Sequence, residues 1–93
     1  MKIVVMKFGG TSVADISKIK NIASIINNNY KKYKLIVVLS AMAGVTNDLQ
    51  ELIDQVGFSS SKENDLVLTS GEQVTVGLLS MVLNKMKIKS IPL

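Results

Sequence analysis

The residues best suited to chemistry lie near the N-terminus, in the run Lys7-Phe8-Gly9-Gly10-Thr11-Ser12. Two adjacent glycines without Cβ atoms let an anion approach the main chain closely, and a helix that begins just after them favours negative charge. Lys7 adds a mobile cation beside them. The run matches neither GxxxxGK followed by Ser or Thr nor GxGxxG, so two interpretations stay open. It is either a cradle for a phosphate group or a strand-to-helix turn that needs glycine only for its backbone dihedral angles.

Composition narrows the chemistry further, because His and Cys are both absent from the 93 residues. Their absence removes the usual general base, thiolate catalysis, disulfides and the common zinc sites. We therefore predict no metal site built from protein ligands. Any catalysis has to use Lys, Ser, Thr and carboxylate side chains.

Charge and hydropathy restrict the partners. The net charge is +4, yet all 11 basic residues are Lys and only 4% of residues are aromatic. Specific DNA recognition relies on Arg and base stacking on aromatic rings, so we expect no nucleic-acid partner. The longest uninterrupted apolar stretches fall short of the ~20 residues that span a bilayer. We therefore expect no membrane segment and a cytoplasmic location.

Three apolar runs predict the strands of the fold. Residues 3–6 and residues 35–39 are short, continuous and rich in β-branched side chains, which is typical of strands buried on both faces. Residues 88–93 indicate a third strand. Since this strand lies at the end of the 93 residues, we expect the sheet to be incomplete.

The helix after the glycines is predicted from its cap and its apolar face. Ser12 and Asp15 form a capping-box pattern, in which a hydroxyl and a carboxylate satisfy backbone N–H groups at the start of a helix. Apolar residues then recur every three or four positions and predict one buried stripe. This stripe consists of Val13, Ile16, Ile19, Ala23 and Ile26.

Further helices are predicted in the second half of the chain. Thr46-Asn47-Asp48 supplies a cap and a favourable charge for one helix, which ends at Gly57. After a connection at residues 59–61, Ser60 and Glu63 repeat the capping-box pattern. The polar residues 69–72 interrupt the next apolar stretch, and whether they break one helix or start another stays open. A long helix follows over residues 73–85.

The order βαβααβ predicts a parallel sheet in a single domain over residues 1–93. Such sheets bind ligands outside the carboxyl ends of their strands. Residues 7–12 follow the first strand and residues 40–46 follow the second. We therefore expect both loops to lie at one ligand-binding edge.

Three segments together give the sequence a resemblance to the aspartate kinases of the amino-acid kinase family. The segments are Lys7-Phe8-Gly9-Gly10-Thr11-Ser12-Val13, Val38-Leu39-Ser40-Ala41-Met42-Ala43-Gly44-Val45-Thr46-Asn47 and Leu68-Thr69-Ser70-Gly71-Glu72-Gln73-Val74. The resemblance runs over all 93 residues but covers only the opening part of the family's kinase domain. It implies an incomplete α/β/α sandwich of the amino-acid kinase (carbamate kinase-like) type, without the regulatory ACT domains.

What this resemblance implies is ATP-dependent phosphorylation of the side-chain carboxylate of L-aspartate. The product would be 4-phospho-L-aspartate, on the way to lysine, threonine and methionine, with Mg²⁺ bridging the ATP phosphates. The substrate carboxylate is itself the nucleophile, so a site without His or Cys is sufficient. By carry-over from the family, Lys7 is the catalytic cation that neutralises the transferring phosphoryl group. The other implied site residues are Phe8, Gly9, Gly10 and Thr11 around the phosphates, and Ser40, Thr46 and Glu72 around the substrate.

Alternative roles stay open for several of these residues. Thr46 has the properties of an ordinary N-cap, Glu72 stands three residues after Thr69 as in a capping box, and Ser40 is suited to satisfying a loop backbone group. At the level of function, the alternatives are a kinase for glutamate, acetylglutamate or a nucleoside monophosphate, and a non-catalytic remnant or split-gene interaction module. In the aspartate kinase interpretation we expect the 93 residues to lack useful activity alone. They would need the missing C-terminal part or a homo-oligomer partner.

Overall fold

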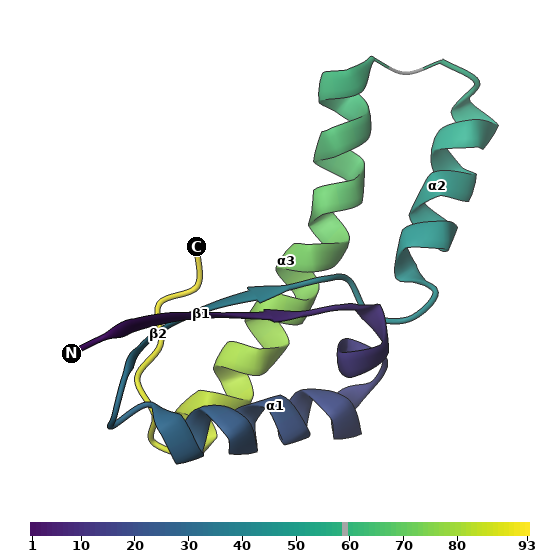
Figure 1. The fold of residues 1–93 in the computed structure, drawn as a ribbon. Helices are drawn as coiled ribbons and strands as arrows, with labels where there is room; N and C mark the ends of the chain where they lie inside the picture. Colours follow the sequence, from purple (N-terminus) through teal and green to yellow (C-terminus); the bar gives the residue numbers. More distant parts are fainter. Residues whose placement is uncertain (59) are drawn as a thin grey trace.

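The computed structural model describes residues 1–58 and 60–93, so Ser59 of the predicted connection lies outside the described residues. Its elements in chain order are β1 (Ile3–Phe8), the 3₁₀ helix η1 (Gly10–Val13), α1 (Ile16–Asn29), β2 (Lys34–Leu39), α2 (Val45–Val56) and α3 (Ser61–Lys85). Figure 1 shows α1 crossing beside the two strands, while α2 and the first half of α3 project away from them. The molecule is elongated, with extents of 48 × 25 × 19 Å.

The two strands form a parallel sheet, as predicted. Their register runs from Ile3 opposite Lys34 to Phe8 opposite Leu39. Parallel neighbours need a crossover connection, and α1 provides it. Both strands are longer than expected, since β1 continues for two residues beyond Met6 and β2 begins at Lys34.

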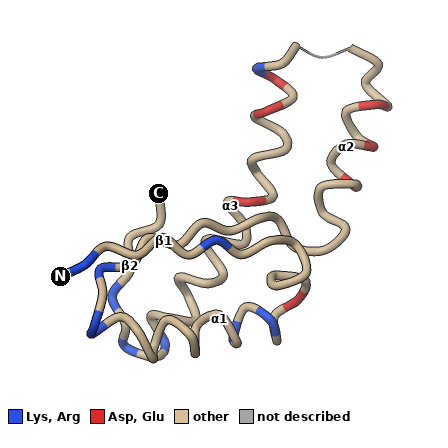
Figure 2. The backbone as a smooth tube through the Cα atoms, viewed as in Figure 1, with Lys and Arg blue, Asp and Glu red and all other residues tan. Residues whose placement is uncertain are grey.

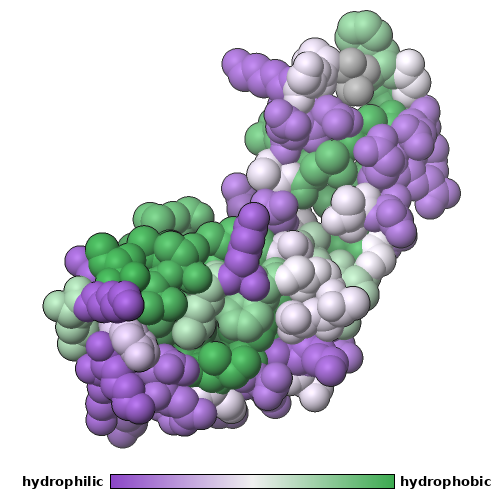
Figure 3. Space-filling view, viewed as in Figure 1, coloured by the Kyte–Doolittle hydropathy of each residue, from purple (hydrophilic) through white to green (hydrophobic). Residues whose placement is uncertain are grey.

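The sheet is covered on one face only among the described residues, so the prediction of strands buried on both faces was wrong. On the covered face, Leu39 joins a core with buried residues of α1 and α3, and Phe8 packs against it. On the other face, Ile3, Val5 and Ile36 are 58%, 62% and 50% exposed. A hydrophobic area lies over the strands in Figure 3. The difference arises because burial on the second face requires a layer that these residues do not include.

The start of α1 differs from the predicted capping box. Its N-cap is Asp15, whose side chain accepts a hydrogen bond from the Lys18 N–H at 2.9 Å. Ser12 lies instead in η1, where its N–H donates to the Gly9 carbonyl at 3.0 Å. The carboxylate is the better placed acceptor because the chain turns once more before α1 begins. The helix buries Ile22 in place of the predicted Ile16, which is exposed at its first position.

The two ends of α2 and the start of α3 are only partly as predicted. The N-cap of α2 is Gly44, in the left-handed region at φ 80°, and no side chain caps this helix. Thr46 is therefore inside the first turn and the prediction that it caps the helix was wrong. The end of α2 at Gly57 is confirmed. The capping box at the start of α3 is also confirmed, with Ser60 and Glu63 each accepting the other's N–H at 3.4 and 3.5 Å.

Helix α3 runs without a break through residues 69–72, so the predicted interruption was wrong. The hydroxyls of this segment bond to carbonyls of their own helix: Thr69 donates to Asp65, and Ser70 donates to Val67 at 2.6 Å. Polar side chains satisfied in this way do not break the helix. The continuous helix is long and apolar enough, by length and composition alone, to cross a membrane, which the division at residues 69–72 had concealed. Core helices of globular proteins pass the same test, and α3 packs against both α1 and α2.

The predicted third strand is absent, because residues 88–93 form no regular structure. The segment is held against α3 instead: the Ile88 N–H donates to the Leu83 carbonyl at 2.9 Å, and the hydroxyls of Ser80 and Ser90 are 2.8 Å apart. Ile88 is buried in the core. A cavity separates this segment from β2, so the backbone hydrogen bonds that define a strand cannot form there.

Candidate functional site

The two loops expected at one edge do lie side by side. The Ser40 N–H donates to the Phe8 carbonyl at 3.1 Å, directly beyond the last residue pair of the sheet. The glycine turn therefore starts next to the loop that follows β2. This contact joins the predicted phosphate-binding residues to the predicted substrate-binding residues.

Two structural features usually require glycine: a positive φ and a lack of space for a Cβ. Neither is present at Gly9 or Gly10. Gly9 has φ −80° and ψ −177°, which any residue adopts, and Gly10 is not among the glycines with positive φ. A Cβ built on either residue meets no atom within 4 Å. The alternative that the turn needs glycine for its dihedral angles was therefore wrong. Glycine also allows a ligand to approach the main chain closely, and for Gly9 and Gly10 this role stays a prediction.

The cation and the hydroxyl of the turn are accessible. Lys7 is exposed and stands opposite Val38 on the open face of the sheet, while Thr11 is exposed in η1. Phe8 and Thr11 also line a depression of about 240 Å³ against α1. The N-terminus of α1 itself is engaged by the Asp15 carboxylate, so it does not supply the free helix end that the sequence suggested.

A close contact at Gly71 holds α3 against the start of α2 and the loop that precedes it. Gly71 is buried, and a Cβ added to it would lie 2.9 Å from Val45 Cγ1 and 3.1 Å from Ala41 Cβ. Only a residue without a side chain lets α3 pack so near residues 40–46. Glu72 follows Gly71 directly and is exposed.

The structure excludes some of the alternative structural roles of Glu72, Thr46 and Ser40. Glu72 lies far inside α3 and Thr69 donates back to Asp65, so these two residues do not form a capping box. Thr46 is exposed, with no side-chain cap hydrogen bond at this helix end. The Ser40 main-chain N–H donates to the carbonyl of Phe8 at the end of β1, and the role of the Ser40 hydroxyl stays a prediction.

Charge is distributed unevenly around the site. Of the seven acidic residues, six lie in α2 and α3. By contrast, ten of the 11 Lys residues lie in or beside the strands, α1 and the end of α3. Figure 2 shows the red positions gathered on the two projecting helices and most blue positions on the rest of the molecule. The positive potential of that part favours an anionic ligand.

Sequence reasoning missed Gly71, which lets α3 pack closely against Ala41 and the start of α2. Its only signal was a glycine in an apolar helical stretch, directly before a carboxylate. Such a glycine is equally typical of a helix break. Only the contact with Ala41 and Val45 separates the two interpretations.

Comparison with known proteins finds a matching protein family. The model of the amino acid kinase family matches residues 2–93. The aspartokinase of Rickettsia felis is 47% identical over 95 aligned residues, which cover 97% of this chain and 24% of that protein. Aspartokinase 2 of Bacillus subtilis is 44% identical, over 91% of this chain and 21% of that protein. The chain thus spans about a quarter of the length of these curated relatives.

Solved structures agree with this family. The aspartate kinase from Synechocystis superposes with a TM-score of 0.89 at 36% identity, over 96% of this chain and 16% of that chain. E. coli aspartokinase III, solved in complex with aspartate and ADP, superposes with a TM-score of 0.75. Its identity of 23% over 96% of this chain and 30% of that chain shows likeness of fold alone.

Proposed function

The chain belongs to the amino acid kinase family, and from this premise we propose that it is the phosphate-binding portion of an aspartate kinase. The reaction is ATP-dependent phosphorylation of the L-aspartate side chain to 4-phospho-L-aspartate, toward lysine, threonine and methionine. The observation that carries the proposal is the glycine turn. Its glycines are required neither by dihedral angle nor by packing, and it lies beside the loop that follows β2.

Phosphoryl transfer depends on positioning and charge stabilisation more than on covalent chemistry by the protein. Lys7 is proposed to place its ammonium group against the transferring phosphoryl group. Gly9 and Gly10 leave the main chain open to the phosphate oxygens, and Thr11 offers a hydroxyl. Phe8 contributes its backbone between the lysine and the turn. The aspartate carboxylate supplies the attacking oxygen, so no side-chain nucleophile is needed.

The substrate is proposed to lie between the two loops. Ser40 and Thr46 offer hydroxyls to its carboxylates, and Glu72 offers a carboxylate to its α-ammonium group. These three residues come from the end of β2, the first turn of α2 and the middle of α3. The packing at Gly71 supports the proposal, because it brings the turn before Glu72 against the 40–46 loop.

The residues present do not fit a Mg²⁺ site of their own. The described part of the chain contains no group of three His, Cys, Asp or Glu side chains that could hold a metal ion. The carboxylate nearest the turn in sequence, Asp15, accepts the Lys18 N–H. Mg²⁺ is therefore proposed only as a companion of the nucleotide phosphates, and no step is derived through it.

The open sheet face supports a proposal about partners and location. Two strands with one face uncovered are marginal by themselves, so the chain is proposed to need the remaining part of a kinase domain or a second copy. A cytoplasmic location is proposed, as expected for an enzyme that uses ATP and a free amino acid.

The test uses a chimera in which this chain replaces the matching segment of the Rickettsia felis aspartokinase. With ATP, Mg²⁺ and aspartate, trapping the product with hydroxylamine should reveal an acyl phosphate. Lys7→Ala should lower kcat by about 10²–10³-fold, the typical effect of removing one donor to transition-state charge. Lys20→Ala, at an exposed position of α1, is the matched control and should leave kcat unchanged.

Three results would contradict the proposal. The first is full activity of the Lys7→Ala chimera. The second is faster turnover of glutamate than of aspartate, which would favour another amino-acid kinase. The third is acyl phosphate formation by the 93-residue chain alone that Lys7→Ala abolishes, because it would show that the remaining kinase domain is not needed.

A further inference from the structure

The chain carries most of its acidic residues on one projecting part, which we call the arm. The arm consists of α2 and the part of α3 that ends at Glu72. It contains six carboxylates and one Lys, a net charge of −5, whereas the other residues contain ten Lys and one Asp, a net charge of +9. All six carboxylates are exposed, and they belong to Asp48, Glu51, Asp54, Glu63, Asp65 and Glu72.

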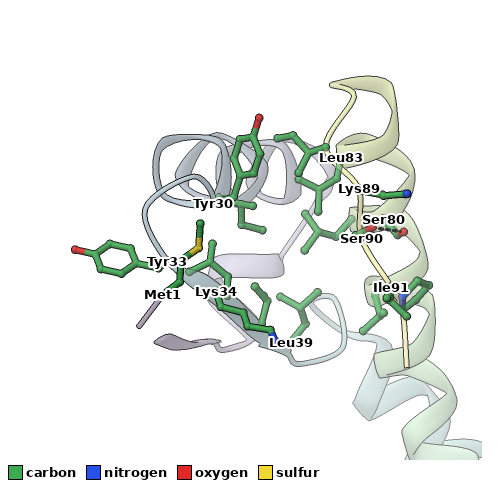
Figure 4. A pocket seen from close by; sticks show the side chains of 17 residues that line it. Met1, Tyr30, Tyr33, Lys34, Leu39, Ser80, Leu83, Lys89, Ser90 and Ile91 are labelled. Carbon is green, nitrogen blue, oxygen red and sulfur yellow. Dashed lines mark hydrogen bonds between the residues drawn. The ribbon is translucent and has the colours of Figure 1, made fainter. Parts of the chain in front are cut away.

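Six lysines gather at the end of the molecule that lies away from the arm, which we call the basic end. Three come from the turn before β2 and its first residue, and three from the end of α3 and the segment after it. Figure 2 shows the two blue groups at the same end of the molecule. Lys34 and Lys89, one from each group, line the same cavity in Figure 4. The six exposed lysines are Lys31, Lys32, Lys34, Lys85, Lys87 and Lys89.

The two charged surfaces are too far apart to neutralise each other within one chain. The molecule is 48 Å long, and Figure 2 shows the arm and the basic end at opposite ends of it. At physiological ionic strength, exposed charges are largely screened beyond about 8 Å. Each surface therefore attracts a partner of opposite sign that touches it directly.

The arm also offers apolar area to such a partner. Leu52, Val56, Phe58 and Leu66 are each more than half exposed. Figure 3 shows hydrophobic surface on the arm between hydrophilic areas. Charge alone contributes mainly orientation and association rate, whereas a stable interface combines an apolar centre with a polar rim. The arm has both components.

We propose that the arm binds the basic end of a second copy of this chain, in a pair with twofold symmetry. Two copies side by side and antiparallel bring each arm to the other's basic end, so both contacts form at once. Such an arrangement is closed and needs no third component. Pairing of arm with arm would place like charges together, which is unfavourable.

The proposal does not depend on the reaction. It concerns surfaces other than the glycine turn and the open face of the sheet. Its readout is association, whereas the proposed function is read from turnover. The two can therefore fail separately.

The salt dependence of association is the first test. Sedimentation velocity of the 93-residue chain should show dimers at about 20 mM NaCl, where charges are weakly screened. At about 500 mM NaCl, the dissociation constant of the dimer should be at least about tenfold higher.

Reversing the charge of each surface is the second test. The arm variant carries Glu51→Lys and Asp65→Lys, and the basic-end variant carries Lys32→Glu and Lys87→Glu. Each variant should lower the affinity of the dimer at least about tenfold, because like charges then face each other in both contacts.

The arm positions were chosen to leave other interactions intact. Glu63 caps α3, Asp54 accepts a hydrogen bond from Gln50, and Glu72 is a proposed substrate residue, so all three are kept. Unchanged slow exchange at the buried Ile22 shows that a variant still folds.

Mixing the two variants separates specific pairing from a general effect of net charge. In the mixture, every reversed surface can meet a surface of opposite sign. Native mass spectrometry should therefore show the mixed pair as the main dimer. The matched control carries Lys18→Glu and Lys20→Glu on α1, with the same change in net charge as the basic-end variant, and should dimerise like the original chain.

Several outcomes would overturn the proposal. A chain that stays monomeric at low salt excludes it, and binding of polyglutamate to that monomer would assign the basic end to a different acidic partner. Association that does not weaken with salt would point to apolar contacts such as the open sheet face. Undiminished dimers of either reversed variant, or a mixture without mixed pairs, would exclude contact between arm and basic end. Assemblies that grow beyond two copies would exclude the closed pair.

Discussion

Replacing Gly71 with alanine tests the contact that holds α3 against α2 and the 40–46 loop. An added Cβ would lie 2.9 Å from Val45 Cγ1, 3.1 Å from Ala41 Cβ and 3.2 Å from Leu49 Cδ1. Leu49 can rotate away, but the Ala41 Cβ is fixed to the loop backbone, so the loop or α2 has to shift. Inserting a group into a packed interface typically costs about 1–3 kcal/mol.

The same helix offers a matched control at Gly77, where an added Cβ meets nothing within 4 Å. Alanine in a helix interior is more stable than glycine by about 0.5–1 kcal/mol. Gly77→Ala should therefore raise the free energy of unfolding by that amount. Gly71→Ala has the same gain but also the steric cost, so we expect it to be about 1–3 kcal/mol less stable than Gly77→Ala.

Thermal and urea unfolding of both variants measure this difference. For a domain of this size, 1 kcal/mol corresponds to roughly 4–8 °C in Tm, so the two Tm values should differ by at least about 4 °C. If Gly71→Ala and Gly77→Ala raised Tm equally, α2 would not pack against α3 at Gly71 in solution. The proposed proximity of Glu72 to the 40–46 loop would then lose its support.

Three further predictions test the core and the helix starts. Ile22→Ala should lower the free energy of unfolding by about 2–5 kcal/mol, whereas Ile36→Ala on the open face should lower it by less than about 1.5 kcal/mol. Equal losses for the two variants in urea unfolding would contradict a sheet that is covered on one face. Asp15→Ala should cost about 1 kcal/mol as a lost N-cap and Ser12→Ala close to nothing, and the reverse order would favour the capping box predicted from sequence. Ser60→Ala should cost about 1 kcal/mol and speed exchange of the Glu63 N–H, so unchanged exchange would argue against that cap.

Local chemistry accounts for what sequence reasoning predicted well. The stop at Gly57 and the capping box of Ser60 and Glu63 depend on residues close together in the chain. The two strands were predicted from short apolar runs, and their parallel pairing is confirmed. The position of both loops at one edge followed from topology alone and was confirmed by the hydrogen bond from Ser40 to Phe8. The roles of Lys7 and the other site residues stay predictions.

Two further predictions failed because distant contacts outweighed local composition. The segment 69–72 has the composition of a break, yet its hydroxyls bond within α3 and Gly71 packs against the 40–46 loop. Residues 88–93 have the composition of a strand, yet Ile88 and the Ser80–Ser90 hydrogen bond hold them against α3. In each case a long-range contact outweighed local preference.

The glycine turn shows most clearly the difference between what neighbouring residues predict and what only the folded structure decides. By itself, the sequence determined that Lys7 and two glycines follow an apolar strand, which is a pattern of near neighbours. Only the tertiary structure decided why the glycines are there, because dihedral angles and surrounding space are known only once the chain is folded. Likewise, only the packed helices decided which sheet face is covered and that the edge of β2 borders a cavity. Residues close together in the sequence determine where most helices and strands form. Contacts between residues far apart in the sequence determine which surfaces of those elements stay exposed.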